Sequence, residues 1–151
     1  MITRPTTDQL LEDVCRELIE EILPALTDET LQVRVAMAET VLRNAAVRAA
    51  HEIAWMTDEA AALTGYARDV AGQLPDPALA ASLADVDTAP PGLHLADVVE
   101  AYDRAGRAFT EALAAAQRAG AAELVAAGRE LLRNRVETEK VIMANYGVVG
   151  R

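Results

Sequence analysis

Apolar residues recur three or four positions apart along most of the chain, which is the spacing of one face of an α-helix. The first such run extends from Leu11 to Ile22, with acidic residues on its other side. Thr6 and Gln9 have the spacing of a capping box, which predicts that a helix begins there. Pro24 predicts where that helix ends, because proline cannot continue the helical hydrogen bonds.

The longest apolar stripe begins after a second cap signal, Thr27 and Asp28. We call it the main stripe; it contains Leu31, Val35, Ala38, Leu42, Ala45, Ala49, Ile53 and Met56, and it continues in phase through Ala60, Leu63, Ala67, Val70 and Leu74. These positions are predicted to be the core, with Leu42 and Leu63 buried.

A further cap signal at Thr57 and Asp58 interrupts the region without breaking this phase. Either one helix covers residues 28–74, or two helices meet near Thr57. A single helix would be roughly 70 Å long, which is long for a small domain. We therefore expect two helices, or one helix bent at Thr57.

The segment from Leu74 to Gly92 contains four of the six prolines and is predicted to be a connection, with one short helix at most. Apolar spacing resumes from Leu95 to Ala116, and Gly120 separates that helix from a last one that ends near Gly147. The pattern predicts an all-α fold, an antiparallel bundle of four or five helices. Its Pro-rich connection lies near residues 75–92, and we expect one domain covering residues 1–151.

The composition agrees with an all-α fold and argues against several classes of function. Hydrophobic residues make up 52% of the chain and aromatic residues only 3%. The formal charge of −10, with arginines interleaved among acidic residues, disfavours binding to nucleic acid or to an anionic membrane. The sequence shows neither a signal-peptide core nor an apolar run that could span a membrane, so a cytoplasmic location is expected.

No residue pattern indicates catalysis. Cys15 is the only cysteine, which leaves no intrachain disulfide, and it reads as a small buried residue whose pKa is raised by nearby carboxylates. Neither histidine has the glutamate three residues earlier that a bundle metal site uses. We predict no enzymatic activity, no metal and no cofactor.

A second stripe runs along the same helical region, away from the main stripe. It contains Val33, Met37, Val41, Asn44, Arg48, His51 and Trp55. Its polar half either lies at the margin of another helix or forms a ligand or partner surface, because tryptophan and arginine are common interface anchors. The candidate surface residues are Asn44, Arg48, His51, Trp55 and Tyr66.

The segment from Arg4 to Leu42 resembles a family of small uncharacterised α-helical bacterial proteins. The shared features are Arg4-Pro5-Thr6, Leu10-Leu11, the run from Glu21 to Leu26, and Arg34-Val35-Ala36; a weaker likeness lies near the C-terminus, in Leu132-Arg133, Val136, Lys140, Asn145 and Tyr146. Genes of that family commonly lie beside aminoglycoside-phosphotransferase-like kinases and acyl-CoA dehydrogenases. The resemblance implies an accessory role near such an enzyme.

These observations predict a non-catalytic accessory or interaction protein. It would self-associate as a homodimer through its first helix or the second stripe, or dock on a kinase-like or acyl-CoA enzyme. The alternative is a helical bundle that binds a small ligand in a polar-aromatic cleft.

Overall fold

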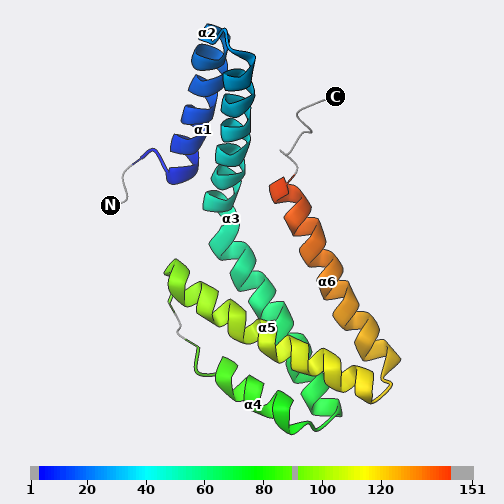
Figure 1. Cartoon of the computed structure of the whole chain (residues 1–151). Helices are drawn as coiled ribbons and strands as arrows, with labels where there is room; N and C mark the ends of the chain where they lie inside the picture. Colours follow the sequence, from blue (N-terminus) through cyan, green and yellow to red (C-terminus); the bar gives the residue numbers. More distant parts are fainter. Residues whose placement is uncertain (1–3, 90–91, 144–151) are drawn as a thin grey trace. The chain divides into compact units, whose positions relative to one another are not determined.

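The computed structural model describes residues 4–89 and 92–143, and every regular element within them is a helix, which confirms the all-α prediction (Figure 1). The elements are α1 (Thr7–Glu17), a π-helical turn (Leu18–Ile22), α2 (Leu23–Ala25), α3 (Glu29–Gln73), α4 (Pro77–Val86), α5 (Leu95–Arg118) and α6 (Ala122–Met143). The predicted features at Pro90, Pro91, Asn145, Tyr146 and Gly147 lie outside the described residues.

Contacts along the chain divide it into two units. Unit 1 holds the residues up to Glu52 together with those from Thr138 onward, and unit 2 holds the residues from Ile53 to Glu137. The helix α3 contributes its first half to unit 1 and its second half to unit 2. The expectation of one domain over residues 1–151 stays a prediction.

The first helix begins as its sequence predicts and ends differently. The backbone N–H of Thr6 donates to Oε1 of Gln9 at 3.1 Å, which completes the capping box. Pro24 does not end the helix at once: the residues before it form a π-helical turn, and helical structure continues to Ala25. A wider turn accommodates the missing N–H and the bulky ring of a proline.

The helix α3 is continuous, so of the alternatives left open near Thr57 the meeting of two separate helices is wrong. Asp28 caps it, with Oδ1 accepting the N–H of Thr30 at 2.7 Å and of Leu31 at 3.2 Å. Thr57 lies inside the helix, and its hydroxyl donates to the carbonyl oxygen of Ile53 at 2.7 Å. A threonine can satisfy its hydroxyl on the preceding turn, which is why its presence does not require a helix start.

The predicted Pro-rich connection contains a packed helix, α4. Oδ1 of Asp76 caps it by accepting the N–H of Ala78 at 2.9 Å and of Leu79 at 3.1 Å, and Pro77 occupies the first turn, where its missing N–H costs nothing. Leu79 is fully buried in the core of unit 2. The one short helix allowed for in this segment is present, and it belongs to the core of unit 2 rather than to a loose connection.

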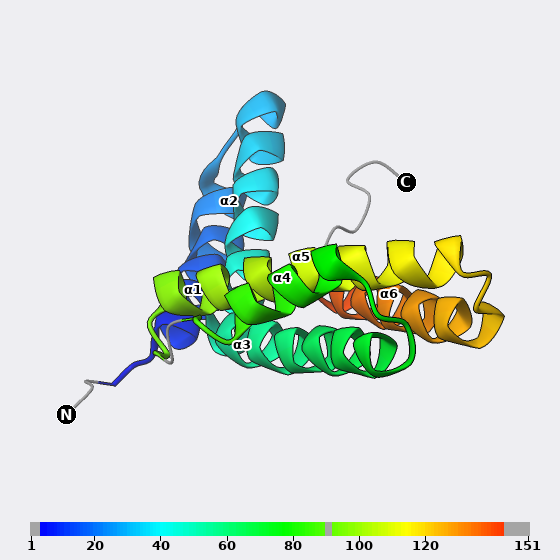
Figure 2. The same cartoon turned by 90° about the horizontal axis from the view of Figure 1, so that it is seen from below.

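Unit 2 has a continuous hydrophobic core built from four helices, which lie side by side in Figure 2. The main stripe enters it at Leu63, which is 1% exposed, as predicted. The buried members are Leu63, Tyr66, Ala67 and Val70 of α3, Leu79 of α4, and Ala105, Ala108, Phe109, Ala112 and Ala115 of α5; Leu124 and Leu131 of α6 pack against them. Gly120, with φ +66°, makes the tight turn between α5 and α6.

Candidate interaction surface

The structure does not bring the five candidate surface residues together. Tyr66 lies in the core of unit 2, where its ring centroid is 5.3 Å from that of Phe109. Its hydroxyl donates to the carbonyl oxygen of Leu124 at 3.0 Å, and burial raises its pKa above the ordinary tyrosine value. Gly128 allows this approach, because a Cβ there would lie 2.9 Å from the Tyr66 hydroxyl. Tyr66 is therefore a packing residue rather than part of a surface.

Arg48, His51 and Trp55 follow one another along α3. Arg48 and His51 are exposed and Trp55 is half-buried. The Arg48 guanidinium forms an ion pair with Glu52 of the same helix, at 3.0 Å. An ion pair of this kind four residues apart supports the helix slightly and leaves the surface nearly neutral.

Asn44, the fifth candidate, is only 6% exposed. Among the described residues, neither Oδ1 nor Nδ2 of its amide has a hydrogen-bond partner. A buried amide without a partner costs about 1–3 kcal/mol. The hydrogen-bonding groups buried in this part of α3 are therefore less well satisfied than those in the core of unit 2.

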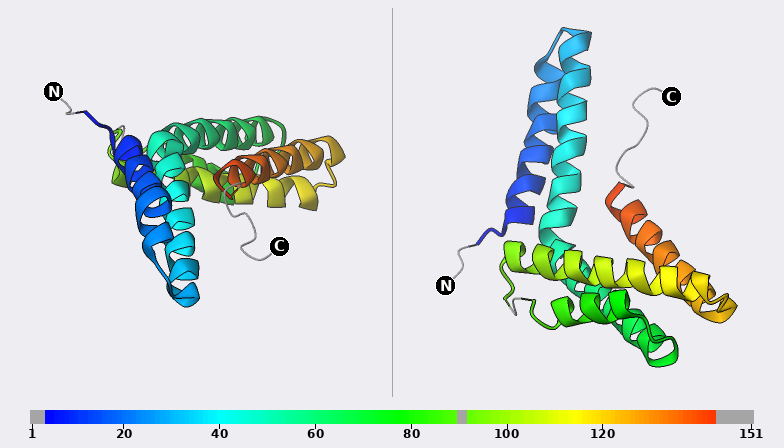
Figure 3. Two further views of the ribbon diagram at one scale, coloured as in Figure 1. Left: turned by 90° about the horizontal axis from the view of Figure 1, so that it is seen from above. Right: turned by 60° about the horizontal axis from the view of Figure 1, so that its bottom comes forward.

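Within unit 1, α1 lies antiparallel to the first half of α3, and the two form a helical hairpin (Figure 3). Its tightest point is Cys15, which is buried and whose Sγ donates to the carbonyl oxygen of Glu39 at 3.6 Å. Burial, and then the charge of Glu39, raise the pKa of the Cys15 thiol. Cys15 is thus the small packing residue that the sequence predicts, which allows the two helices to approach closely.

One side of this hairpin is charged. A groove on it is lined by Glu12, Arg16, Ile19 and Glu20 from the α1 side and by Arg43 from α3. Arg43 pairs with Glu39, and Arg16 pairs with Asp13 at 3.0 Å. This is the pattern of a solvent-facing surface.

The other side is apolar, and we call it the open face. A groove lined by both Leu10 and Ala49 shows that these positions of α1 and α3 face the same side. Helical spacing places further residues on that side. The open face consists of Leu10, Val14 and Leu18 on the α1 side and Leu31, Val35, Ala38, Leu42 and Ala45 on α3. Its outer members are substantially exposed: Leu10 51%, Val14 46% and Leu31 44%.

The α3 half of the open face is the first half of the main stripe. The sequence predicts these positions as core, but Leu42 is half-buried and Leu31 and Ala38 are exposed. In unit 2 the same stripe is covered by further helices, and Leu63 is buried. Within the described residues of unit 1, every position of the stripe from Leu31 to Ala45 is exposed or half-buried. The correction concerns burial and not direction: the residues lie on one side of α3, as predicted, and the described residues cover that side only partly.

The apolar half of the second stripe is exposed as well. Val33 is 47% exposed, and Met37 and Val41 are more exposed still. Helical spacing places Val33 on nearly the opposite side of α3 from Leu31. The hairpin thus has two apolar regions, of which only the open face extends over both helices.

Sequence reasoning missed two polar clusters in unit 2. The first joins three helices: the Tyr102 hydroxyl donates to Oε2 of Glu59 at 2.9 Å, and Nε of Arg135 donates to Oε1 of the same carboxylate at 2.5 Å. The Arg135 guanidinium also lies 5.6 Å from the Tyr102 ring centroid. Burial and the hydrogen bond to Glu59 raise the pKa of Tyr102. Its members are 43 and 76 positions apart from Glu59 in the chain, so no local motif could have indicated it.

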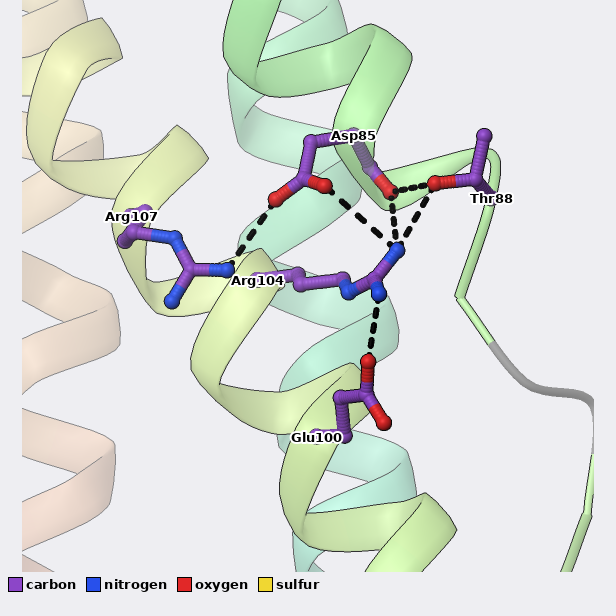
Figure 4. Close-up of polar contacts among 5 residues, drawn as sticks. All are labelled: Asp85, Thr88, Glu100, Arg104 and Arg107. Carbon is purple, nitrogen blue, oxygen red and sulfur yellow. Dashed lines mark hydrogen bonds and ion pairs between the residues drawn. The ribbon is translucent and has the colours of Figure 1, made fainter.

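The second cluster fastens α4 to α5 (Figure 4). Nη1 of Arg104 donates to the Asp85 carbonyl oxygen at 2.9 Å and to the Thr88 hydroxyl at 2.7 Å, and Nη2 pairs with Glu100. Arg107 pairs with the Asp85 carboxylate at 3.0 Å. These contacts satisfy the C-terminal end of α4 and offer no activated nucleophile or base, so the cluster is structural.

Two further features are absent from the described part of the chain. No group of three or more histidine, cysteine, aspartate or glutamate side chains there could hold a metal ion. No helix there has both the length and the apolar character needed to cross a bilayer.

Comparison with known proteins gives no relative: no family model matches the chain, and neither does any curated protein or solved structure.

Proposed function

We propose that the protein is a non-catalytic interaction protein that self-associates through the open face of its hairpin. The observation that carries this proposal is that, among the described residues of the hairpin, one side is apolar and largely exposed while another side is charged. A pair of amphipathic helices needs a second layer to bury its apolar side. Covering a Leu or Val side chain that is exposed contributes up to about 1.5–3 kcal/mol each, which is enough to favour association.

A second copy of the chain supplies such a layer without any further component. Two hairpins placed face to face make a four-helix bundle, in which each helix buries its apolar side in a shared core. The accessory role beside a kinase-like or acyl-CoA enzyme rests on the resemblance in residues 4–42, which make up most of this hairpin. In this proposal the dimer is the form that would dock on such an enzyme.

Two neighbouring residues of α3 test this proposal. Leu31 and Val33 are similarly exposed, at 44% and 47%, and both lie in the first turns of the helix, yet they face different sides. Leu31→Asp places a charge in the open face, whereas Val33→Asp places it in the second stripe. We expect Leu31→Asp to weaken the dimer at least about 100-fold, because an unpaired carboxylate at a covered position is costly, and Val33→Asp to have little effect.

Sedimentation equilibrium over a concentration series measures both effects, against a chain mass of 16.1 kDa. A wild-type chain that stays at this mass at all concentrations contradicts self-association. Loss of the dimer in Val33→Asp alone assigns the interface to the second stripe instead.

A further inference from the structure

Charged residues border the open face along both of its long edges. Helical spacing places Arg34 at the outer edge on α3, and Glu17 and Glu21 at the outer edge on the α1 side. All three are exposed, and none of them forms an ion pair with another described residue. One edge is therefore basic and the other acidic, and each lies beside apolar side chains.

These charges lie at the same height along the hairpin. The contact between Cys15 and Glu39 fixes the register of the two antiparallel helices. Because the helices are antiparallel, moving forward along the α1 side corresponds to moving backward along α3. Glu17 and Glu21 lie two and six residues after Cys15, and the positions at the same height on α3 are Met37 and Val33, two and six residues before Glu39. Arg34 lies within that interval, so the two edges carry opposite charges at one level.

We propose that the two copies of the dimer are related by a two-fold axis parallel to the helices, so that Arg34 of each copy pairs with Glu17 and Glu21 of the partner subunit. This inference rests on the proposed self-association and specifies its geometry. A two-fold axis in this direction places α1 of one copy on α3 of the other and preserves height along the bundle. Every pair of neighbouring helices is then antiparallel, as in an up-down-up-down bundle.

Charge selects this arrangement over its main competitor. A two-fold axis perpendicular to the helices would place α1 against α1, bringing carboxylates of the two acidic edges together. Like charges facing each other across an interface disfavour that pairing, whereas opposite charges fix the register. The parallel axis is the arrangement in which the basic and acidic edges meet.

A mixing experiment tests the proposal in the full-length chain. One variant carries Arg34→Glu, and the other carries Glu17→Arg with Glu21→Arg. In the homodimer of either variant, like charges meet at both edges of the interface. We expect the dissociation constant of each homodimer to rise about tenfold or more. In a mixed dimer each substituted edge meets an opposite charge, so the two variants together should regain approximately the wild-type dissociation constant.

Arg16→Glu is the matched control, because it makes the same change of charge on the opposite, charged side of the hairpin. Sedimentation equilibrium of each variant, of the control and of the equimolar mixture gives the result. Recovery in the mixture, together with a small effect of the control, establishes the arrangement. If Arg34→Glu weakens the dimer no more than Arg16→Glu does, or if the mixture fails to recover, the arrangement is wrong.

Failure of this geometry is distinguishable from failure of the proposed function. Val14→Asp, a change within the open face on α1, dissociates any dimer that uses this face, whatever its axis. Dissociation by Val14→Asp with no recovery in the charge mixture overturns the two-fold arrangement and keeps the open face as the interface. A dimer that is insensitive to Val14→Asp overturns both.

Discussion

At the scale of single residues, burial separates two leucines that the sequence treats alike. Leu42 and Leu63 both belong to the main stripe and both are predicted to be core. Leu63 is 1% exposed and belongs to the core that α3 forms with α4, α5 and α6, whereas Leu42 is half-buried in the hairpin. The pattern of one helix determines which way a side chain points. It does not determine what lies opposite.

This difference predicts unequal costs of truncation. Leu63→Ala should lower the free energy of unfolding by about 2–5 kcal/mol, because it leaves a cavity in a closed core. Leu42→Ala should cost only about 1 kcal/mol in dilute solution, where its side chain still contacts solvent. Urea denaturation at low protein concentration measures both, and equal losses would show that the hairpin has a closed core after all.

At the scale of elements, α4 shows how ion pairs supplement a short helix. Its N-terminal cap, Asp76, pairs with Arg118 at 2.7 Å, and this carboxylate has a lowered pKa because it accepts backbone and Arg118 hydrogen bonds. At the other end Asp87 pairs with Arg68 at 2.8 Å. Exposed ion pairs of this kind each contribute little to the free energy of unfolding. Leu79 is fully buried, so its apolar contacts hold α4 more firmly than the ion pairs do.

Among these arginines, Arg104 should matter most. Its side chain is 17% exposed and contacts Asp85, Thr88 and Glu100, whereas the side chain of Arg107 is 60% exposed. Arg104→Ala should lower the free energy of unfolding by about 1–3 kcal/mol, because it leaves carbonyl and hydroxyl groups without their donor. Arg107→Ala, the control, should cost less than about 1 kcal/mol. Equal costs in thermal or urea denaturation would mean that the partly buried network adds nothing.

Helix positions followed from sequence more reliably than helix limits. Capping residues located the starts at Thr6 and Asp28: the Gln9 side chain accepts the Thr6 backbone N–H, and the Asp28 carboxylate accepts backbone N–H groups of α3. Thr57 carried the same local signal inside a continuous helix, and prolines around α4 concealed a core element. The Thr57 hydroxyl is satisfied on the preceding turn of α3, so its local signal was ambiguous. The burial of α4 depends on contacts with distant helices, which no single segment reveals.

At the scale of the whole molecule, the two units use one stripe in different ways. From Leu63 onward the main stripe is covered by α4, α5 and α6, whereas from Leu31 to Ala45 it forms half of the open face. The apolar character of that face was predictable from periodicity. The exposure of that face was not predictable, because it depends on whether another helix of the chain packs against it. The candidate surface on the second stripe was a weaker prediction, since Tyr66 turned out to be core and Asn44 buried.

The measurement that tests the central claim most directly is hydrogen exchange at two protein concentrations, below and above the onset of association. If a second copy covers the open face, amides of Thr7–Glu17 and of the first half of α3 should exchange more slowly at the higher concentration. Association stabilises the segments that it covers against local opening. Amides around Leu63 to Val70, whose core is complete within one chain, should exchange at the same rate at both concentrations. Unchanged exchange in the hairpin, or protection that appears only in unit 2, would contradict self-association through the open face.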